Sequence, residues 1–411
     1  MNHRQLYKTI ENIASKKFAL LEDLLKHVID EIIASNKFSF TGGRAWRLIP
    51  EKLSYELIYQ AGNIEKISDN YIVKVKDYHV FLEVAKYKTL LAEETNKYLR
   101  KKGILKYSLV GVGNKIKNGN AVLYEYLLAF NHDDKQGQSA LYQLSIVGSA
   151  VTSTIRRNKA DEKTKQLEKD LSKAHEIQKS ILPEHDLIFG DYEIYGLSLP
   201  ELVVGGDFFD YIISPGETER VSIVIGDAAS KGISAAIQAL YVSGAIRMGM
   251  TFQIQIASLL YRINNLVNKA FPYDRFVTLF FAEFMNKSNG LCVFSNAGHN
   301  NPIFYKSAEN VIEQLPVTGT AIGISPNQKY EVENINMKKG DILVLFTDGI
   351  SEAMNSQFEQ YTEERIAKLI IELKDLSPKS ICLNIIEDVM SFSKNSAYSD
   401  DKTIVVVKKT H

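Results

Sequence analysis

The stretch VVGGDFFDYI (203–212), followed after a short polar turn by VSIVIGDAASKG (221–232), decides the fold of the second half of this 411-residue chain. The apolar run in each stretch has the length of a strand and is rich in Val, Ile and Phe, and the turn between them contains Pro and Gly. The pattern therefore predicts a hairpin-like pair of strands. Asp207 and Asp227 lie where these strands give way to turns.

The same pattern recurs twice further along the chain. In GDILVLFTDG (340–349), a buried type of strand ends at Asp348, and the pair Asp400-Asp401 directly precedes an apolar strand at 403–408. An Asp beside a Gly is by itself most simply a turn residue, because its side chain hydrogen-bonds its own backbone. Four acidic strand ends, three of them with glycine next to the acid, instead favour a shared site.

Carboxylates that gather in one place repel each other, so a fold that collects them needs cations. Hard oxygen ligands suit Mg²⁺ or Mn²⁺, and the sequence has no Cys or His set with zinc spacing. Two such ions would lower the pKa of a water molecule between them and hold a phosphoryl group. The acids thus point to metal-assisted phosphate chemistry.

Six stretches together resemble a known family. They are AHEIQKSILP (174–183), VVGGDFFDYI (203–212), GDAASKGISAA (226–236), NAGHNNPIFY (296–305), GDILVLFTDGISEA (340–353) and SDDKT (399–403). In their order and spacing they resemble the bacterial PPM/PP2C-type serine/threonine phosphatases of the RsbU-like and SpoIIE-like kind. The resemblance implies an α-β-β-α sandwich for residues 183–411, with two Mn²⁺ or Mg²⁺ ions. The implied metal ligands are Asp207, Asp227, the Ala228 carbonyl, Asp348 and Asp400, of which Asp207, Asp227 and Asp348 are also the implied catalytic residues.

The family also implies the activity. It points to a protein serine/threonine phosphatase in which water attacks phosphorus directly, without a phosphoenzyme, and whose substrate is a small phosphorylated regulator, typically an anti-anti-sigma (STAS-domain) protein of a partner-switching pathway. An alternative is a catalytically weak phosphoprotein-binding or sensor module. Ser230 supports that alternative, because the family usually has glycine there and serine is penalised where φ must be positive.

Three further residues near these motifs have more than one interpretation. At 400–401 the family usually uses the first acid, so Asp401 is the less favoured ligand. His299 could act as a general acid, but its place in NAGHNN favours a role in supporting the turn. Lys231 could meet a phosphate group, although an exposed lysine that opens a helix is ordinary.

The overall composition excludes several classes of protein. The chain carries 49 Lys and Arg against 49 Asp and Glu, which argues against a general nucleic-acid binder. Its two cysteines give neither a disulfide framework nor metal spacing and fit a reducing compartment. The sequence lacks an apolar run long enough for a membrane span, and its polar start lacks a signal-peptide core. We therefore expect a cytoplasmic protein with no membrane segment.

Residues 1–135 are predicted to form an α+β domain. A long amphipathic helix is expected over 5–36, strands over 43–50, 52–62 and 70–87, a helix near 90–101, and strands over 105–113 and 120–132. This layout resembles a GAF sensory domain, which would bind an unknown signal ligand or an upstream regulator. An α+β domain that only mediates dimerisation is an equal alternative.

Residues 136–182 are predicted to form a helical linker. Its middle, RRNKADEKTKQLEKD, is too charged for a core helix, and apolar positions recur at steps of four and three from Ala160 to Ile181, with Thr164 and Gln178 as polar members. The pattern predicts a coiled coil that makes a homodimer, with a single solvated helix as the alternative. If the coiled coil forms, rotation or a register shift of this helix would carry signals from the first domain to the phosphatase domain.

Overall fold

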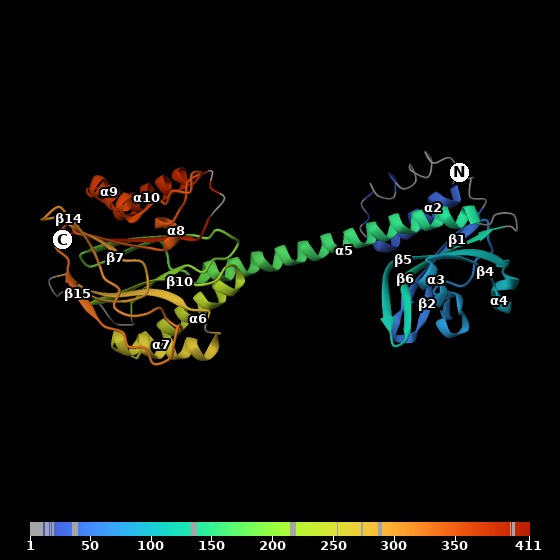
Figure 1. The fold of residues 1–411 in the computed structure, drawn as a ribbon, viewed down its shortest axis with the longest axis horizontal. Helices are drawn as coiled ribbons and strands as arrows, with labels where there is room; N and C mark the ends of the chain where they lie inside the picture. Colours follow the sequence, from blue (N-terminus) through green and yellow to red (C-terminus); the bar gives the residue numbers. More distant parts are fainter. Residues whose placement is uncertain are drawn as a thin grey trace. The chain divides into compact units, whose positions relative to one another are not determined.

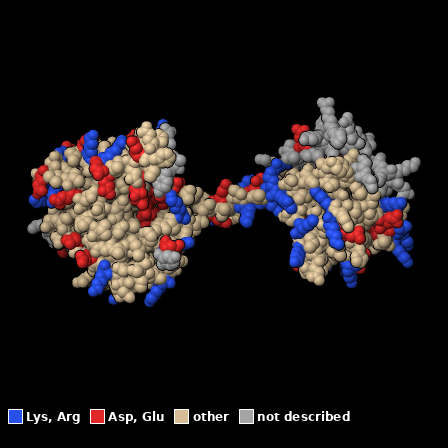
Figure 2. Space-filling model, viewed as in Figure 1, with Lys and Arg blue, Asp and Glu red and all other residues tan. Residues whose placement is uncertain are grey.

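The structure, a computed structural model, describes residues 11–12, 16, 18, 20–34, 40–132, 138–213, 219–252, 254–272, 274–286, 290–394, 396 and 399–411. The chain divides into two compact units, residues 1–167 and 168–411. Among the described residues, no helix has both the length and the apolar character that crossing a bilayer requires. On the face of each unit seen in Figure 2, side chains of both signs of charge are present.

The N-terminal unit is built on one antiparallel sheet with the strand order β3-β2-β1-β6-β5-β4 (Figure 1). Its elements are α2 (Leu21–Ala34), β1 (Phe40–Ile49), β2 (Ser54–Gly62), β3 (Ile72–Lys74), α3 (Val80–Tyr87), β4 (Thr89–Glu93), α4 (Lys97–Lys101), β5 (Lys106–Asn118) and β6 (Ala121–His132), with short 3₁₀ turns at Pro50–Lys52 and Val75–Asp77.

Both faces of this sheet are covered. Successive residues of a strand point to opposite faces, so the apolar runs in β5 and β6 bury side chains on both sides. Leu128 packs with α2 and the start of α5 (Gln138–Ile181), whereas its neighbour Leu127 packs with the cluster that includes α3. The unit is therefore an α-β-α sandwich. The GAF assignment itself stays a prediction.

Three sequence-based predictions in this unit need correction. The helix expected over 5–36 is interrupted: residues 11–12 are helical, Lys16, Phe18 and Leu20 are not, and the helix continues as α2. The remaining expected residues lie outside the described ones. The strand predicted over 70–87 ends at Lys74, and residues 80–87 are helical. Phe81, Val84 and Ala85 of this segment are buried at the spacing of a helix. The high apolar content of the segment made this helical periodicity hard to distinguish from a strand.

The helix predicted near 90–101 is also wrong in its first part. Residues 89–93 form β4, which pairs with β5, and the helix begins only after Asn96, whose side chain accepts hydrogen bonds from the Tyr98 and Leu99 amides. Edge pairing of a short apolar segment thus outweighed its helix propensity. The predicted strands at 43–50, 52–62, 105–113 and 120–132 are confirmed by β1, β2, β5 and β6.

A single helix, α5, occupies the predicted linker. From position 161 to 170 every residue is exposed, as expected for its charged composition, and the coiled-coil pairing of this segment stays a prediction. Gln178 departs from the seam pattern because its side chain is buried within the C-terminal unit.

The C-terminal unit contains two antiparallel sheets, with the orders β15-β12-β11-β10-β9 and β14-β13-β16-β17-β8-β7. The strands are β7 (Asp186–Phe189), β8 (Tyr192–Leu199), β9 (Phe208–Ile212), β10 (Arg220–Ala228), β11 (Val277–Met285), β12 (Leu291–Ala297), β13 (Ile303–Lys306), β14 (Val311–Gln314), β15 (Glu333–Asn336), β16 (Ile342–Phe346) and β17 (Lys402–Lys409). The helices are α6 (Ile233–Met250), α7 (Ile256–Ala270), α8 (Asp348–Ser351), α9 (Glu363–Leu373) and α10 (Pro378–Phe392).

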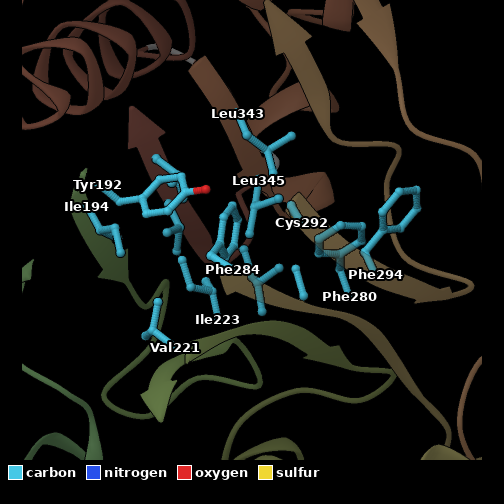
Figure 3. Packing of buried hydrophobic residues seen from close by; sticks show 14 of the residues in the cluster. Tyr192, Ile194, Val221, Ile223, Phe280, Phe284, Cys292, Phe294, Leu343 and Leu345 are labelled. Carbon is cyan, nitrogen blue, oxygen red and sulfur yellow. The ribbon is translucent and has the colours of Figure 1, made fainter. Parts of the chain in front are cut away.

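The two sheets pack face to face through aromatic and branched side chains. Phe280 and Phe284 from one sheet and Leu345 from the other belong to one buried cluster (Figure 3). Helices α6 and α7 cover the outer face of the first sheet, and α9 and α10 cover that of the second (Figure 1). This is the α-β-β-α arrangement predicted for residues 183–411.

Candidate active site

The predicted acids come from both sheets. Asp207 directly precedes β9, and Asp227 is the penultimate residue of β10, which pairs with β9 in the predicted hairpin. In the other sheet, Asp348 begins α8 just after β16, and Asp400 lies just before β17, the antiparallel partner of β16. Antiparallel pairing therefore brings one strand's end beside its neighbour's start in each sheet.

One hydrogen-bonded threonine joins the two sheets at this point. The Thr347 hydroxyl donates to the Asp207 carboxylate across 2.7 Å, and the same hydroxyl accepts the Thr403 amide at 3.0 Å. Thr347 is fully buried, so these bonds are protected from water. They fix the Asp207 side chain relative to the second sheet.

The acids influence one another strongly. Burial raises the pKa of Asp207 well above its usual range, and the charge of Asp227 raises it further. Burial, followed by the charges of Asp348 and Asp400, raises the pKa of Asp227 to about 7. The pKa of Asp348 is also raised, by burial and then by Asp400. The structure thus brings together the four acids that the sequence singled out.

Asp400 and Asp401 have different surroundings. The Asp401 carboxylate accepts the backbone amides of Gly206 at 2.6 Å and Glu201 at 2.8 Å, so it fixes the loop that carries Asp207. Asp400 instead forms an ion pair of 3.1 Å with Lys231, which also contacts Glu201. This division agrees with Asp400 as the more suitable ligand of the pair, because Asp401 is already engaged by amides.

Glycines allow the loops to approach each other. A Cβ on Gly349 would overlap the carbonyl oxygen of Asp401, and one on Gly205 would lie 2.5 Å from the Asp401 carboxylate. In the structure, these two glycines allow the loop that carries Asp401 to lie close to the loops that carry Asp348 and Asp207.

The departure at Ser230 is well tolerated by the backbone. Ser230 is not among the described non-glycine residues with positive φ, and its hydroxyl accepts a hydrogen bond from Gln238 at 3.2 Å. The Ser230 amide donates to the Ala228 carbonyl at 2.6 Å, which leaves that oxygen one further lone pair for a ligand. Serine at position 230 is therefore compatible with the backbone conformation of the metal loop.

The chemistry of the donor atoms decides whether a metal ion fits this site. Among the described residues, no group of three or more His, Cys, Asp or Glu side chains is already arranged to hold one. The donors are nevertheless hard oxygens, and the Asp207 and Asp227 side chains lie within hydrogen-bonding reach of each other. Two carboxylates this close repel each other, and a divalent cation would relieve that repulsion. The residues therefore fit a cation chemically.

His299 lies beneath this site and is fully buried. Its ring Nδ1 is 2.9 Å from the Thr278 hydroxyl, and its amide donates to the Asn296 side chain at 2.7 Å. Burial lowers the pKa of His299 to about 4, so the ring is neutral at pH 7. These contacts favour the turn-supporting role over general acid catalysis.

Three residues important to the site geometry escaped the sequence analysis. The buried Gln178 of α5 donates to the Gly205 carbonyl at 2.7 Å and accepts the Gly205 amide at 3.3 Å. Arg247 of α6 forms two bonds to the buried Asp210 carboxylate, at 2.6 and 2.8 Å, and one to the Ile181 carbonyl at 3.1 Å. The only signal for Gln178 in the sequence was its polar character at a seam position, which Thr164 shares.

The C-terminal unit is similar to known proteins. Residues 217–410 match the family described as "Stage II sporulation protein E (SpoIIE)". The chain is 25% identical over 250 residues to the phosphoserine phosphatase RsbU of Bacillus subtilis, covering 59% of this chain and 71% of RsbU. It is 23% identical over 444 residues to protein IcfG of Synechocystis, covering 98% of this chain but 65% of IcfG.

A solved structure shows the same fold. The "SiaA-PP2C domain of Pseudomonas aeruginosa" aligns with a TM-score of 0.51 at 18% identity, over 60% of this chain and 98% of that domain. This structural similarity supports the fold alone. The sequence matches show the relationship to phosphatases. The C-terminal unit of this chain is therefore a PP2C-type phosphatase domain of the SpoIIE group, homologous to RsbU.

Proposed function

We propose that this protein is a metal-dependent serine/threonine phosphatase regulated by its N-terminal unit. The observation that carries the proposal is the convergence of Asp207, Asp227, Asp348 and Asp400 from two sheets, with three of them holding raised pKa values through burial and each other's charge. Acids in this arrangement repel each other and destabilise the fold, so packing alone does not explain why they are gathered. Perturbed carboxylates at strand ends are typical of functional sites.

Each residue has a part in this proposal. Asp207, Asp227, Asp348, Asp400 and the Ala228 carbonyl would hold Mn²⁺ or Mg²⁺, while Thr347 and Asp401 keep the Asp207 loop in place. When bound, a pair of such ions supplies activation of water and neutralisation of phosphoryl charge. Lys231, beside Asp400, provides a further positive charge at the site.

The substrate and setting are inferred from the relatives. RsbU is named a phosphoserine phosphatase, so we infer a phosphoserine or phosphothreonine protein as the substrate. We further propose a STAS-domain anti-anti-sigma protein in partner-switching signalling, a homodimer formed through α5, and a cytoplasmic location.

Phosphate release from a phosphoserine STAS protein tests the proposal. The intact chain should release phosphate with Mn²⁺ and lose this activity in chelator, and Asp348→Asn should be inactive with Mn²⁺. Asp341→Asn is the matched control, because Asp341 lies at the other end of β16 and only accepts the Ser307 and Lys338 amides. It should keep the metal dependence.

Two results would contradict the enzyme assignment. One is metal binding without turnover, which would favour the phosphoprotein-binding alternative. The other is equal phosphate release with Mn²⁺ and with chelator, which would place the chemistry outside the acidic site.

Gln178→Ala is expected to lower the phosphatase activity of the intact chain about tenfold. The substitution removes both bonds to Gly205, and each hydrogen bond of this kind contributes about 1 kcal/mol. The loop before Asp207 would then lose its tie to α5, so Asp207 would be held less firmly. Steady-state rates at several Mn²⁺ concentrations measure the effect, which we expect chiefly in the apparent metal affinity.

Lys179→Ala is the control for this prediction. Lys179 is the next residue of the same helix and is exposed, so its loss should leave the rate unchanged. Equal rates for Gln178→Ala and the unmodified chain would show that the end of α5 does not position the Asp207 loop.

A further inference from the structure

A buried arginine in the N-terminal unit lacks the partners that such a group requires. Arg44 of β1 is 2% exposed, and its Nη atoms donate to the Asn131 side chain at 3.1 Å and to the Glu65 carbonyl at 3.2 Å. Its Nε atom is buried with no hydrogen-bond partner. Among the described carboxylates, none forms an ion pair with Arg44.

This arrangement is costly for the fold. Burial lowers the pKa of Arg44 to about 10, and the charge of Glu94 opposes that shift only in part. A buried charge without a close counterion destabilises a protein by several kcal/mol. An apolar residue in this position would avoid the cost, so the guanidinium is more easily explained by a ligand than by stability.

The arginine lines a cavity. The cavity has a volume of about 40 Å³, and its wall is formed by Arg44 and Asn131 together with apolar and aromatic side chains, among them Trp46, Phe81 and Tyr107. This volume corresponds to roughly three water-sized positions. A small molecule with a few heavy atoms would fill it.

Glu94 forms the acidic part of the same wall. It is 4% exposed, and one of its carboxylate oxygens accepts the Tyr78 hydroxyl at 2.9 Å and the Asn96 amide at 2.8 Å. Glu94 is therefore held in place by its neighbours and is not paired with Arg44. The wall of the cavity therefore carries one cation, Arg44, and one anion, Glu94, that do not form an ion pair with each other.

We propose that this cavity binds a small carboxylate-bearing molecule, with the carboxylate on Arg44 and the rest of the molecule against the aromatic side chains. The free Nε–H and the guanidinium plane suit a carboxylate, which accepts two parallel hydrogen bonds. Two sources share this chemistry: simple carboxylic acids, and α-amino acids whose ammonium group would face Glu94. This site lies outside the phosphatase domain and does not depend on its activity.

Trp46 provides a direct readout. It is the single tryptophan of the chain and lines the cavity, so its fluorescence reports on occupancy in the intact protein. The probes are acetate and propionate, each paired with its neutral amide, and glycine and alanine. We expect a saturable change with at least one carboxylate at micromolar to millimolar concentration, given the small number of ligand atoms. The corresponding amide should bind at least tenfold more weakly.

Two variants make the test specific to Arg44. Arg44→Gln should weaken carboxylate binding at least tenfold. Arg47→Gln should have no effect, because Arg47 lies on the same strand but pairs with Glu22 and Glu56 at the surface. Circular dichroism checks that both variants fold.

Glu94→Gln gives evidence that does not depend on the folding of the Arg44 variant. Removing the negative charge should tighten the binding of a simple carboxylate and weaken that of an amino acid, so it also separates the two sources. No saturable change with any carboxylate or amino acid would overturn the proposal. So would equal binding of acid and amide, or undiminished binding by a folded Arg44→Gln.

Discussion

Asp227→Asn is expected to make the metal-free protein more stable at pH 8 while it reduces Mn²⁺-dependent phosphate release by about a hundredfold or more. Burial and the neighbouring acids raise the pKa of Asp227 to about 7 in the folded protein, above its ordinary value of 3.8. The neutral amide removes a charge that the fold disfavours. It also removes one of the proposed metal ligands.

The sign of the pH dependence follows from that shift. Between pH 4 and pH 7 the folded state binds more protons at Asp227 than the unfolded state does, so this residue lowers the free energy of unfolding as the pH rises. The penalty is fully present above pH 7 and vanishes below pH 4. We expect Asp227→Asn to gain roughly 1–3 kcal/mol at pH 8, a range kept below the full shift because the side chain is partly solvated.

Chemical denaturation in chelator at pH 8 and pH 5 measures this effect. The gain should shrink at pH 5, and added Mn²⁺ should stabilise the unmodified chain much more than the variant. Asp341→Asn again serves as the control, because its carboxylate is satisfied by backbone amides and its loss should destabilise the chain. A destabilised Asp227→Asn that responds fully to Mn²⁺ would contradict the proposed metal role.

Gly349→Ala should have the second large effect. The added methyl group would overlap the Asp401 carbonyl oxygen, a backbone atom that cannot turn aside as a flexible side chain could. Separating the two loops would move Asp348 and Asp400 apart and strain the bonds that Asp401 makes to Gly206. We expect a loss of about 1–3 kcal/mol in the free energy of unfolding, with phosphatase activity close to background.

Thermal unfolding and phosphate release together check this prediction. Gly244→Ala is the control, because a Cβ at Gly244 in α6 would meet no atom within 4 Å, and alanine is the better helix former. That variant should be as stable as the unmodified chain or slightly more so. Normal activity in Gly349→Ala would show that the close contact of the two loops is not needed for the site.

Some features of this protein follow from the sequence alone. Each acidic strand end carried its own signal, because an apolar run with Asp at one end specifies a strand and its boundary locally. The family resemblance that the motifs carry implied the α-β-β-α sandwich of residues 183–411, which the observed sheets and helices form. The uninterrupted helix α5 followed likewise from the near absence of helix-breaking residues over 139–182.

Other features were decided only by tertiary contacts. Residues 89–93 form a strand because they pair with β5. Gln178 does not follow the predicted seam because its side chain is hydrogen-bonded to the Gly205 carbonyl. The lack of an ion pair between Arg44 and any described carboxylate is likewise invisible in the sequence, since it depends on how strands far apart in the chain are placed. Local patterns set which elements form, whereas the partners of buried polar groups are set by distances that only the folded chain defines.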